Sequence, residues 1–434
     1  MQAASNKLVS VADSIAKWNN RKREMMERIR PDYYDKFTCI ADQCTFTCCQ
    51  EWKIAVDPDT NRKWKKVSAP ADVPEQKKNL SAYTEKKDGL RVIQLDSDHR
   101  CPFLSENRLC RLVIAYGDKI LSETCTTFPR EIHRFPCHIE ETLMPCCPAV
   151  IDLLEQADAS QFPDVPTECD TPLFQIRRNI LRLLLPASSP VRSVEDYSIE
   201  PCSAEICSTE DLLLKIHYIL QELYRNDSLD ETLIRDYFSA DTLSQLSDAI
   251  QSIHLPAEDT FFECNELLQD LAVNYQGEKL YCDFLNPIFS LSEYISESAT
   301  DFMHPVSFPS LDTGTSLSEL WSDFQIRFSE VQPLMLKFLA NEIFSDLVTP
   351  DSHLEDLLIR IQWIALEYSA IRQSLFLQWL QNNRSTLTYE MVRRTLVIIT
   401  RMTGYEEEDI RKYLTNSFEA LIWDWGYFAL ILGH

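Results

Sequence analysis

The chain has 434 residues, of which 45% are hydrophobic and 10% aromatic, so it can bury two or three domain cores and is not a disordered polypeptide. Its formal charge of −25 is unevenly spread: residues 1–150 carry 24 basic and 21 acidic side chains, whereas the remaining residues carry 18 and 46. This contrast predicts two domains that meet near residues 150–165, and an acidic body without a basic tract argues against nucleic-acid binding.

The N-terminal third of the chain predicts little regular structure after its first segment. Residues 1–30 are expected to hold an N-terminal helix, over residues 8–30, which Pro31 ends. Residues 31–165 form the predicted metal-binding domain, because cysteines are dense there and helical periodicity is weak. The local patterns expected inside it are β-like runs at residues 53–57 and 90–95 and a charged surface excursion over residues 61–88.

The remainder of the chain is predicted to be helical. Residues 166–207 combine an amphipathic helix at 173–185 with a linker rich in Pro, Ser and Glu. Residues 208–434 form an acidic α-helical domain that begins at the capping sequence Ser208-Thr209-Glu210-Asp211. Apolar spacings of three and four predict further helices at 229–238, 241–253, 258–275, 316–331, 334–347, 354–382, 387–402 and 406–418. The predicted fold class is mainly α, with an irregular cysteine-rich N-terminal domain followed by an all-helical C-terminal domain.

The sequence gives no indication of a membrane protein. No run reaches the roughly 18–20 apolar residues that a spanning helix needs, and the apolar stretch 421–432 is shorter and contains Asp424. The amino terminus lacks the charged, apolar and small-residue pattern of an export signal. We therefore expect no transmembrane segment and a cytoplasmic location, where clustered cysteines are more often metal ligands or catalysts than disulfides.

Glycine is scarce, which excludes several nucleotide-binding motifs. The chain has seven glycines, and no two lie within five positions of each other. Dinucleotide fingerprints and P-loops need closely spaced glycines, because backbone N–H groups must approach phosphate. The same requirement argues against an ordinary Rossmann-type methyltransferase.

The cysteines gather in the N-terminal part, where eleven of the fifteen precede residue 170. Ten of these fall into three blocks, namely Cys39, Cys44, Cys48 and Cys49; Cys101, Cys110 and Cys125; and Cys137, Cys146 and Cys147. Many thiolates on loops in a reducing compartment suit an iron–sulfur cluster or zinc, and softness alone does not separate the two. The remaining cysteines are expected to be buried as small apolar groups: Cys169, Cys202, Cys207, Cys264 and Cys282.

Two familiar metal motifs do not fit this pattern. The adjacent pair Cys48-Cys49 does not suit a four-cysteine zinc finger, whose ligands come in C-x2-C pairs. The radical-SAM spacing C-x3-C-x2-C is broken, because Glu51 occupies its third position. Three nearby histidines offer further donors, although a surface or hydrogen-bonded histidine is the commoner role: His99, His133 and His138.

The ordered motifs of residues 31–150 resemble those of the flagellin lysine-N-methylase family (FliB-like), and also the wider set of zinc- or iron-chelating domains with a clustered CC signature. The residues that carry the resemblance are Phe37, Cys39, Cys44, Cys48, Cys49, Trp52, Ile54, Asp57, Cys101-Pro102-Phe103-Leu104, Leu109-Cys110, Gly117, Leu121, Cys125, Phe128-Pro129-Arg130 and Cys147-Pro148. The helical remainder resembles the family in length and character. Glu51 and Ala149 depart from the family pattern and put the local loop shape in question.

The resemblance implies a function and a ligand set. Such proteins transfer methyl groups from S-adenosylmethionine to the ε-amino groups of flagellin lysines, and the family is associated with a 4Fe–4S cluster. The cysteines that map onto the family pattern are Cys39, Cys44, Cys48, Cys49, Cys101, Cys110, Cys125 and Cys147. Four thiolates suffice for one cubane cluster, so eight leave spare ligands.

The catalytic residues are open at this stage. Methyl transfer needs a neutral amine, and candidates for its proton acceptor, by position only, are Asp57, Tyr33, Tyr34 and Tyr116. Two other functions compete with the methyltransferase. One is a non-catalytic zinc- or iron-binding adaptor for a protein partner, which the lack of a glycine-rich cofactor loop favours; the other is a redox sensor that uses the same metal centre.

Overall fold

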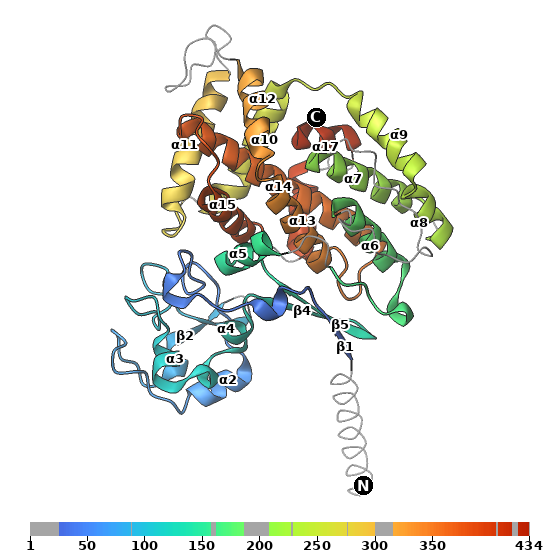
Figure 1. Cartoon of the computed structure of the whole chain (residues 1–434). Helices are drawn as coiled ribbons and strands as arrows, with labels where there is room; N and C mark the ends of the chain where they lie inside the picture. The colour runs from blue at the N-terminus through green and yellow to red at the C-terminus, as the bar shows by residue number, and fades with distance from the viewer. Residues whose placement is uncertain are drawn as a thin grey trace, which may run out of the picture.

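The computed structural model describes residues 26–87, 89–157, 162–185, 208–226, 229–275, 277–299, 316–404, 407–418 and 424–433. Helices dominate these residues, and the few strands and short helices of the N-terminal part lie below the helical body in Figure 1. The predicted mainly α fold class is therefore confirmed. The linker expected at 186–207 lies outside the described residues.

The N-terminal helix expected over residues 8–30 lies mostly outside the described residues. For its last turn, which the structure does describe, the prediction is wrong. Glu27–Ile29 form strand β1, which pairs in parallel with strand β5 (His138–Leu143). Arg28 and Arg30 both form ion pairs with Glu141 of β5. A strand partner 111 positions away thus overrides the local helical pattern, because strand pairing depends on context more than on propensity.

A small apolar core organises the cysteine-rich part. The cysteine-rich part contains four short 3-10 helices: η1 (Tyr34–Lys36), η2 (Ala41–Gln43), η3 (Leu80–Tyr83) and η4 (Asp118–Ile120). It also contains the helices α2 (Pro58–Trp64), α3 (Arg111–Tyr116) and α4 (Glu123–Thr127), and the antiparallel strands β2 (Thr84–Lys87) and β3 (Leu90–Ile93). The expected surface excursion over 61–88 is partly wrong, because Trp64, Leu80 and Tyr83 are buried against Phe103.

A three-stranded sheet lies between this small core and the helical body. Its order is β1-β5-β4, in which β4 (Arg130–Arg134) runs antiparallel to β5. Every residue of β5 is buried, so the strand lacks the polar alternation by which a half-exposed strand is recognised. Of the β-like runs expected, 90–95 yields β3, whereas 53–57 forms only an isolated bridge between Ala55 and Val92.

The helical body contains the helices that the apolar spacing predicts, each within a few residues of its expected ends. They are α6 (Pro172–Leu184), α7 (Thr209–Arg225), α8 (Glu231–Tyr237), α9 (Ala240–Gln251), α10 (Ala257–Ala272), α12 (Leu317–Phe328), α13 (Gln332–Asp346), α14 (Leu354–Gln381), α15 (Tyr389–Met402) and α16 (Glu407–Phe418). Not expected were α5 (Pro148–Gln156), α11 (Cys282–Ala299), α17 (Trp425–Leu432) and the 3-10 helices η5 (Thr167–Cys169) and η6 (Val273–Tyr275). The predicted cap of α7 is confirmed, since Ser208 and Asp211 form a reciprocal capping box.

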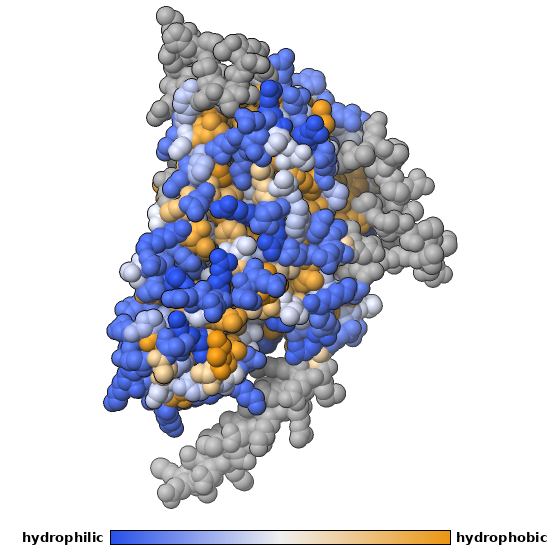
Figure 2. Space-filling view, turned by 60° about the vertical axis from the view of Figure 1, so that its left-hand side comes forward, coloured by the Kyte–Doolittle hydropathy of each residue, from blue (hydrophilic) through white to orange (hydrophobic). Residues whose placement is uncertain are grey.

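Helix α14 is the centre of the body. Most of its side chains are buried, and α7, α10, α13, α15 and α17 pack around it (Figure 1). Strand β5 and helix α5 pack on α13, so the sheet is joined to the body by buried surface. The face in Figure 2 is largely hydrophilic, with apolar residues in small scattered groups. None of the described helices combines the length and the apolar character that a membrane span requires.

Candidate metal centre

Three loops of the cysteine-rich part bring their thiols together. The Cys101 backbone N–H donates to the Cys49 carbonyl at 2.7 Å, and the adjacent Gln50–Arg100 bridge aligns the first two cysteine blocks. Cys125 sits in α4, whose first turn is capped by the Ser122 hydroxyl. Cys101 is buried in the small core, and Cys49, Cys110 and Cys125 pack against that core.

The thiols of these loops are close enough to influence each other's ionisation. A hydrogen bond from Cys49 lowers the pKa of Cys48 to about 7, and the same bond raises the pKa of Cys49. Burial, together with the charges of Cys48 and Cys110, raises the pKa of Cys125 to about 11. Burial raises the pKa of Cys101, and Cys125, Cys110 and Cys48 add to the rise. Five thiols therefore form one electrostatic group: Cys48, Cys49, Cys101, Cys110 and Cys125.

The other three predicted ligands border this group. Burial raises the pKa of Cys147 to about 12, and the charges of Cys44 and Cys48 contribute. Cys44 is influenced in turn by Cys48 and by Cys39, which is exposed. The structure thus brings all eight predicted cysteines into one neighbourhood around Cys48, with Cys39 at its edge. We call these eight residues the thiol centre.

The thiol centre has the donor chemistry of an iron–sulfur or zinc site. Its eight sulfurs are free thiols in the structure, and several thiolates in one buried place repel each other unless a cation neutralises them. The donor set comes from short loops over a core of modest size, as is typical where metal bonds supply part of the folding energy. The donor types of the thiol centre therefore suit such a group, although no three of its eight sulfurs lie within 4.8 Å of one another in the structure.

Arg401 of α15 is a functional residue that the sequence analysis missed. Its buried guanidinium donates to the carbonyl oxygens of Cys146 (3.0 Å) and Phe46 (2.6 Å), and it lies 5.5 Å from the Trp52 ring centroid. Its charge helps to lower the pKa of Cys48, which burial would otherwise raise. Nothing in its local sequence marks this role, because its partners lie more than 250 positions away.

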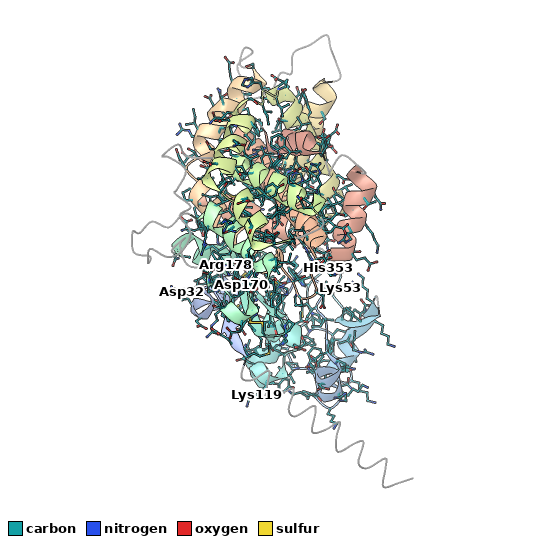
Figure 3. The ribbon with its side chains drawn as sticks, turned by 90° about the vertical axis from the view of Figure 1, so that its right-hand side faces the viewer. Asp32, Lys53, Lys119, Asp170, Arg178 and His353 are labelled. Atoms are coloured by element: carbon teal, nitrogen blue, oxygen red, sulfur yellow. A yellow bond between two sulfur atoms is a disulfide. The ribbon has the colours of Figure 1, made fainter. Side chains whose placement is uncertain are left out.

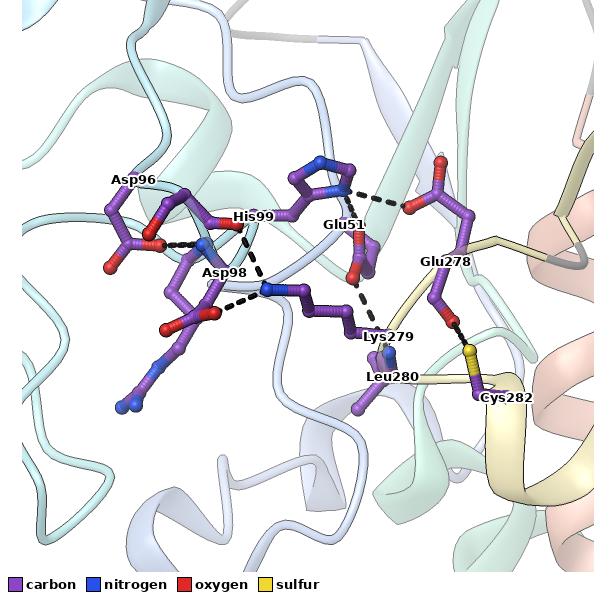
Figure 4. Close-up of polar contacts among 10 residues, drawn as sticks. Glu51, Asp96, Asp98, His99, Glu278, Lys279, Leu280 and Cys282 are labelled. Carbon is purple, nitrogen blue, oxygen red and sulfur yellow. Dashed lines mark hydrogen bonds and ion pairs between the residues drawn. The ribbon is translucent and has the colours of Figure 1, made fainter.

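Three further groups of side chains offer metal-type donors, with donor atoms that all lie within 4.8 Å of one another. They are Glu51, His99 and Glu278; Glu131, His133 and Asp346; and Cys137, His138 and Cys169. In the first group, His99 Nδ1 lies 2.5 Å from Glu51 and 3.2 Å from Glu278, so hydrogen bonds already satisfy it (Figure 4). Cys169 is buried as expected, but it is bonded to Cys137 in a disulfide.

The second of these groups is part of a larger set of buried carboxyl groups, behind Cys146. Glu131 and His133 come from β4, Glu342 and Asp346 from α13, and Glu367 from α14. Burial raises the pKa of Asp346 to about 7, Glu131 adds to this rise, and Arg360 opposes it. Burial likewise raises the pKa of Glu367 to about 7, although Thr403 donates a hydrogen bond to it. We call Glu131, His133, Glu342, Asp346 and Glu367 the carboxyl cluster.

His133 shows that not every buried polar atom of the carboxyl cluster has a hydrogen-bond partner. Its buried Nε2 atom has no hydrogen-bond partner among the described residues and lies 3.5 Å from Glu131 Oε1. Asp346 and Glu367 can exchange protons near neutral pH, and Glu131 and Glu342 also contribute to the raised pKa of Cys146, the residue before Cys147. The residues of the carboxyl cluster come from three elements, β4, α13 and α14, so no short sequence motif predicts the cluster.

The four residues considered as proton acceptors from sequence have structural roles instead. Asp57 caps α2 by accepting from the Thr60 N–H at 2.8 Å, and Tyr116 donates to the Ser68 carbonyl at 2.9 Å. Tyr33 donates to Asn341 at 2.5 Å in the core, where burial raises its pKa. The Tyr34 ring packs against the guanidinium groups of Arg30 and Arg130, and burial raises its pKa as well.

Comparison with known proteins adds to this geometry. A family model described as the FliB lysine N-methylase C-terminal domain matches residues 212–431, which include Arg401 and most of the helical body. A lysine-N-methylase of Salmonella typhimurium is 28% identical over 169 residues, covering 35% of this chain and 40% of the relative. A lysine-N-methylase of Salmonella choleraesuis is 32% identical over 166 residues, with the same coverage.

A third relative is shorter. The flagellar biosynthetic protein FliU of Salmonella muenchen is 29% identical over 141 residues, covering 30% of this chain and 78% of the relative. The chain spans about 40% of the length of the two lysine-N-methylases that it matches. No solved structure matches it.

Proposed function

Because the chain belongs to the FliB lysine N-methylase family, we propose that it is a protein lysine N-methyltransferase. We further propose S-adenosylmethionine as its methyl donor and flagellin as its protein substrate, acting in the cytoplasm. The match of residues 212–431 to the family model carries the proposal, and the names of two similar proteins, each a lysine-N-methylase, support it. The flagellar name of the third relative supports flagellin.

The thiol centre is proposed to hold a 4Fe–4S cluster, with zinc as the alternative metal. The candidates for its ligands are the eight cysteines of the thiol centre, of which a cubane needs four. Bound there, the cluster would supply thiolate–iron bonds that cross-link the loops around Cys48. Arg401 holds the same loops from the helical side through the carbonyls of Phe46 and Cys146.

Methyl transfer requires a lysine that has lost its proton, because the free ammonium group has a pKa of about 10.4 and no lone pair for the methyl group. We propose that the carboxyl cluster binds the lysine ammonium group and that Asp346 takes its proton. Asp346 is half-buried, whereas Glu342 and Glu367 are buried more deeply behind it. A pKa of about 7 lets Asp346 be ionised at neutral pH and still accept a proton. When bound, the sulfonium donor would supply the methyl group and leave as a thioether.

A direct assay tests the proposal. The protein is purified without oxygen, its iron, sulfide and zinc are measured, and it is incubated with purified flagellin and isotope-labelled S-adenosylmethionine. Mass spectrometry of flagellin peptides should find labelled methyl groups on lysine only when protein and donor are both present. An iron-loaded protein that leaves flagellin unlabelled would contradict the proposed activity.

A metal-binding adaptor is the second candidate, because the chain has no closely spaced glycines to bind a nucleotide-like cofactor. The same preparation separates the two functions. Stoichiometric zinc without iron, flagellin binding and no methylation would favour the adaptor. Iron, acid-labile sulfide and lysine methylation would exclude it.

A further inference from the structure

Cys137 and Cys169 join the sheet to the start of helix α6. Cys137 lies in the turn between β4 and β5, which is closed by the hydrogen bond from the Phe135 N–H to the His138 carbonyl. Cys169 ends the 3-10 helix η5, just before α6 begins at Pro172. The two sulfurs form a disulfide with a Cα–Cα distance of 6.0 Å. Neither residue belongs to the thiol centre.

A histidine points at this sulfur pair. The Nδ1 atom of His138 lies 3.4 Å from Cys137 Sγ, and the two sulfurs and the imidazole donor all lie within 4.8 Å of one another. The His138 side chain is fully buried, with its ring stacked on Phe135 at a centroid distance of 4.7 Å and edge-on to Phe174. Packing thus fixes the direction in which Nδ1 points.

The other ring nitrogen of His138 is held by a carboxylate. Its Nε2 atom lies 3.2 Å from Glu140 Oε1, and Arg177 donates to both oxygens of that carboxylate at 2.5 and 2.7 Å. The Glu140 carboxylate, which Arg177 holds in place, accepts a hydrogen bond from Nε2 of His138. This contact favours the His138 tautomer with the proton on Nε2. The lone pair of Nδ1 then faces the sulfurs. Metal-binding histidines commonly have this second contact, because the carboxylate orients the ring and makes it a better ligand.

We propose that Cys137, His138 and Cys169 form a second metal site, which takes a zinc-class divalent ion when the two cysteines are reduced. Two thiolates and one imidazole are a ligand set that zinc uses, with water in the fourth position. Cys137 is exposed whereas His138 and Cys169 are buried, so the open position faces solvent on the Cys137 side. The disulfide in the structure is the oxidised, metal-free form of the same site.

The exchange between the two forms balances as follows. A dithiol reductant transfers two electrons and two protons to the S–S bond, which breaks to give two thiols while the reductant becomes a disulfide. Zinc then binds both sulfurs as thiolates and releases two protons. A disulfide oxidant reverses the exchange: it accepts two electrons from the two thiolates and two protons from solvent to become a dithiol, the S–S bond of the site forms again, and the ion leaves. In either form the site ties η5 to β5, beside the 2.7 Å ion pair between Asp170 and Arg178 (Figure 3).

This site is separate from the thiol centre. His138 begins β5, whereas Cys146 and Cys147 follow its other end. A strand rises roughly 3.3 Å per residue, so β5 alone sets the two places on the order of 17–20 Å apart. Zinc retention at one place can therefore be measured while the other is already loaded.

Metal retention tests the site without any measurement of methylation. Protein with its thiol centre already loaded is treated anaerobically with a dithiol, incubated with zinc or cobalt(II), and passed through a desalting column. The wild-type protein should retain one more equivalent of metal than Cys137→Ser, and its cobalt form should gain a sulfur-to-cobalt absorption band that the variant lacks. Cys264→Ser, whose thiol is buried among α10 and α17, is the matched control and should behave like the wild type.

Metal release on re-oxidation is the second measurement. Wild-type protein should release that equivalent as two thiols disappear, whereas Cys137→Ser should release none. Because Cys137 is exposed, its serine variant should keep the wild-type circular dichroism spectrum, and in the reduced, metal-free state also the wild-type melting temperature, which confirms that the comparison is between folded proteins. Equal retention by the wild type, Cys137→Ser and Cys264→Ser would overturn the proposal.

Discussion

At the residue scale, one side chain, Cys48, influences the ionisation of most other thiols in the thiol centre. Cys48 is its midpoint, because Cys44, Cys101, Cys125 and Cys147 all respond to the charge of Cys48. Thiols buried in this way stay protonated when alone, and each bound metal ion favours their thiolates. The loss of one central sulfur should therefore matter more than the loss of a buried cysteine elsewhere.

Replacement of Cys44, Cys48 or Cys125 by serine should remove iron and lysine methylation together, each by about tenfold or more, because a hydroxyl is a poor ligand for iron–sulfur clusters. Iron and sulfide analysis and the flagellin assay measure both quantities. Cys264→Ser should leave both unchanged, since Cys264 lies in α10 and donates to the Ile431 carbonyl of α17. Full iron in two of the three variants would refute the ligand assignment.

The carboxyl cluster makes a separate prediction about pH. The kcat of methylation should rise as the pH increases through about 7, because Asp346 accepts a proton only when it is ionised. Asp346→Asn should reduce kcat by about 10²–10⁴-fold and abolish this limb of the profile. Asp323→Asn, at an exposed position of α12, should leave rate and profile unchanged. A normal profile in Asp346→Asn would assign the proton acceptor elsewhere.

At the scale of elements, the sequence predicts those structures whose cause is local. Helix α7 could be predicted because Ser208 and Asp211 cap it and apolar residues recur at helical spacing. Strand β5 could not, because it is buried at every position and its pattern has no period. Strand β1 depends on a partner 111 positions away, and Arg401 depends on carbonyls that are even more distant in sequence. The eight cysteines could be gathered from their motifs, but the carboxyl cluster is made by packing alone.

Helix α17 shows how one glycine ends an element. Gly433 has φ +84°, and a Cβ added there would lie 2.8 Å from a guanidinium nitrogen of Arg372. Arg372 bonds the carbonyls of Ile431 and Leu432 and pairs with Glu210 of α7 at 2.8 Å, so it cannot easily move. Gly433 thus allows the buried arginine to satisfy the last carbonyls of α17.

Gly433→Ala should lower the free energy of unfolding by about 1–2 kcal/mol, because a left-handed backbone and a close contact are both unfavourable for alanine. Urea unfolding followed by circular dichroism measures this change. Gly277→Ala is the matched control: a Cβ there meets nothing within 4 Å, and the variant should change stability by less than about 0.5 kcal/mol. Equal stability of the two variants would contradict the strain argument.

At the scale of the whole molecule, polar contacts join the two apolar cores. Besides Arg401, the loop before α11 meets the cysteine-rich part, where Glu278 contacts His99, Lys279 pairs with Asp98, and the Leu280 N–H donates to Glu51 at 3.3 Å (Figure 4). Hydrogen bonds that His99 donates to Glu278 and Glu51 raise the pKa of His99. Burial, and then the hydrogen bond with Glu278, raises the pKa of Glu51 to about 7.

This junction should loosen as the pH rises through about 7. Both groups have a folded-state pKa above their unfolded values of about 4.3 and 6.5, so both bind protons more tightly in the folded form and lose that contribution with rising pH. Amide hydrogen exchange at residues 96–101 should accelerate beyond the intrinsic effect of pH. The part of the effect that comes from His99 should be below about 1 kcal/mol, because the His99 side chain is 50% exposed. His99→Gln, which cannot be charged, should lose only the part of this dependence that His99 contributes, because burial and Glu278 still raise the pKa of Glu51.

The hydrogen bonds from Arg401 to the cysteine loops form late during biosynthesis, after the cysteines themselves have been made. The thiol centre lies in the first third of the chain, but the cation that holds its loops emerges 254 positions after Cys147. At roughly 5–20 residues per second, synthesis leaves on the order of 10–50 s in which all eight thiols exist without it. If the thiol centre takes its proposed metal in the finished geometry, loading follows translation, and the thiols must stay reduced until Arg401 has been made.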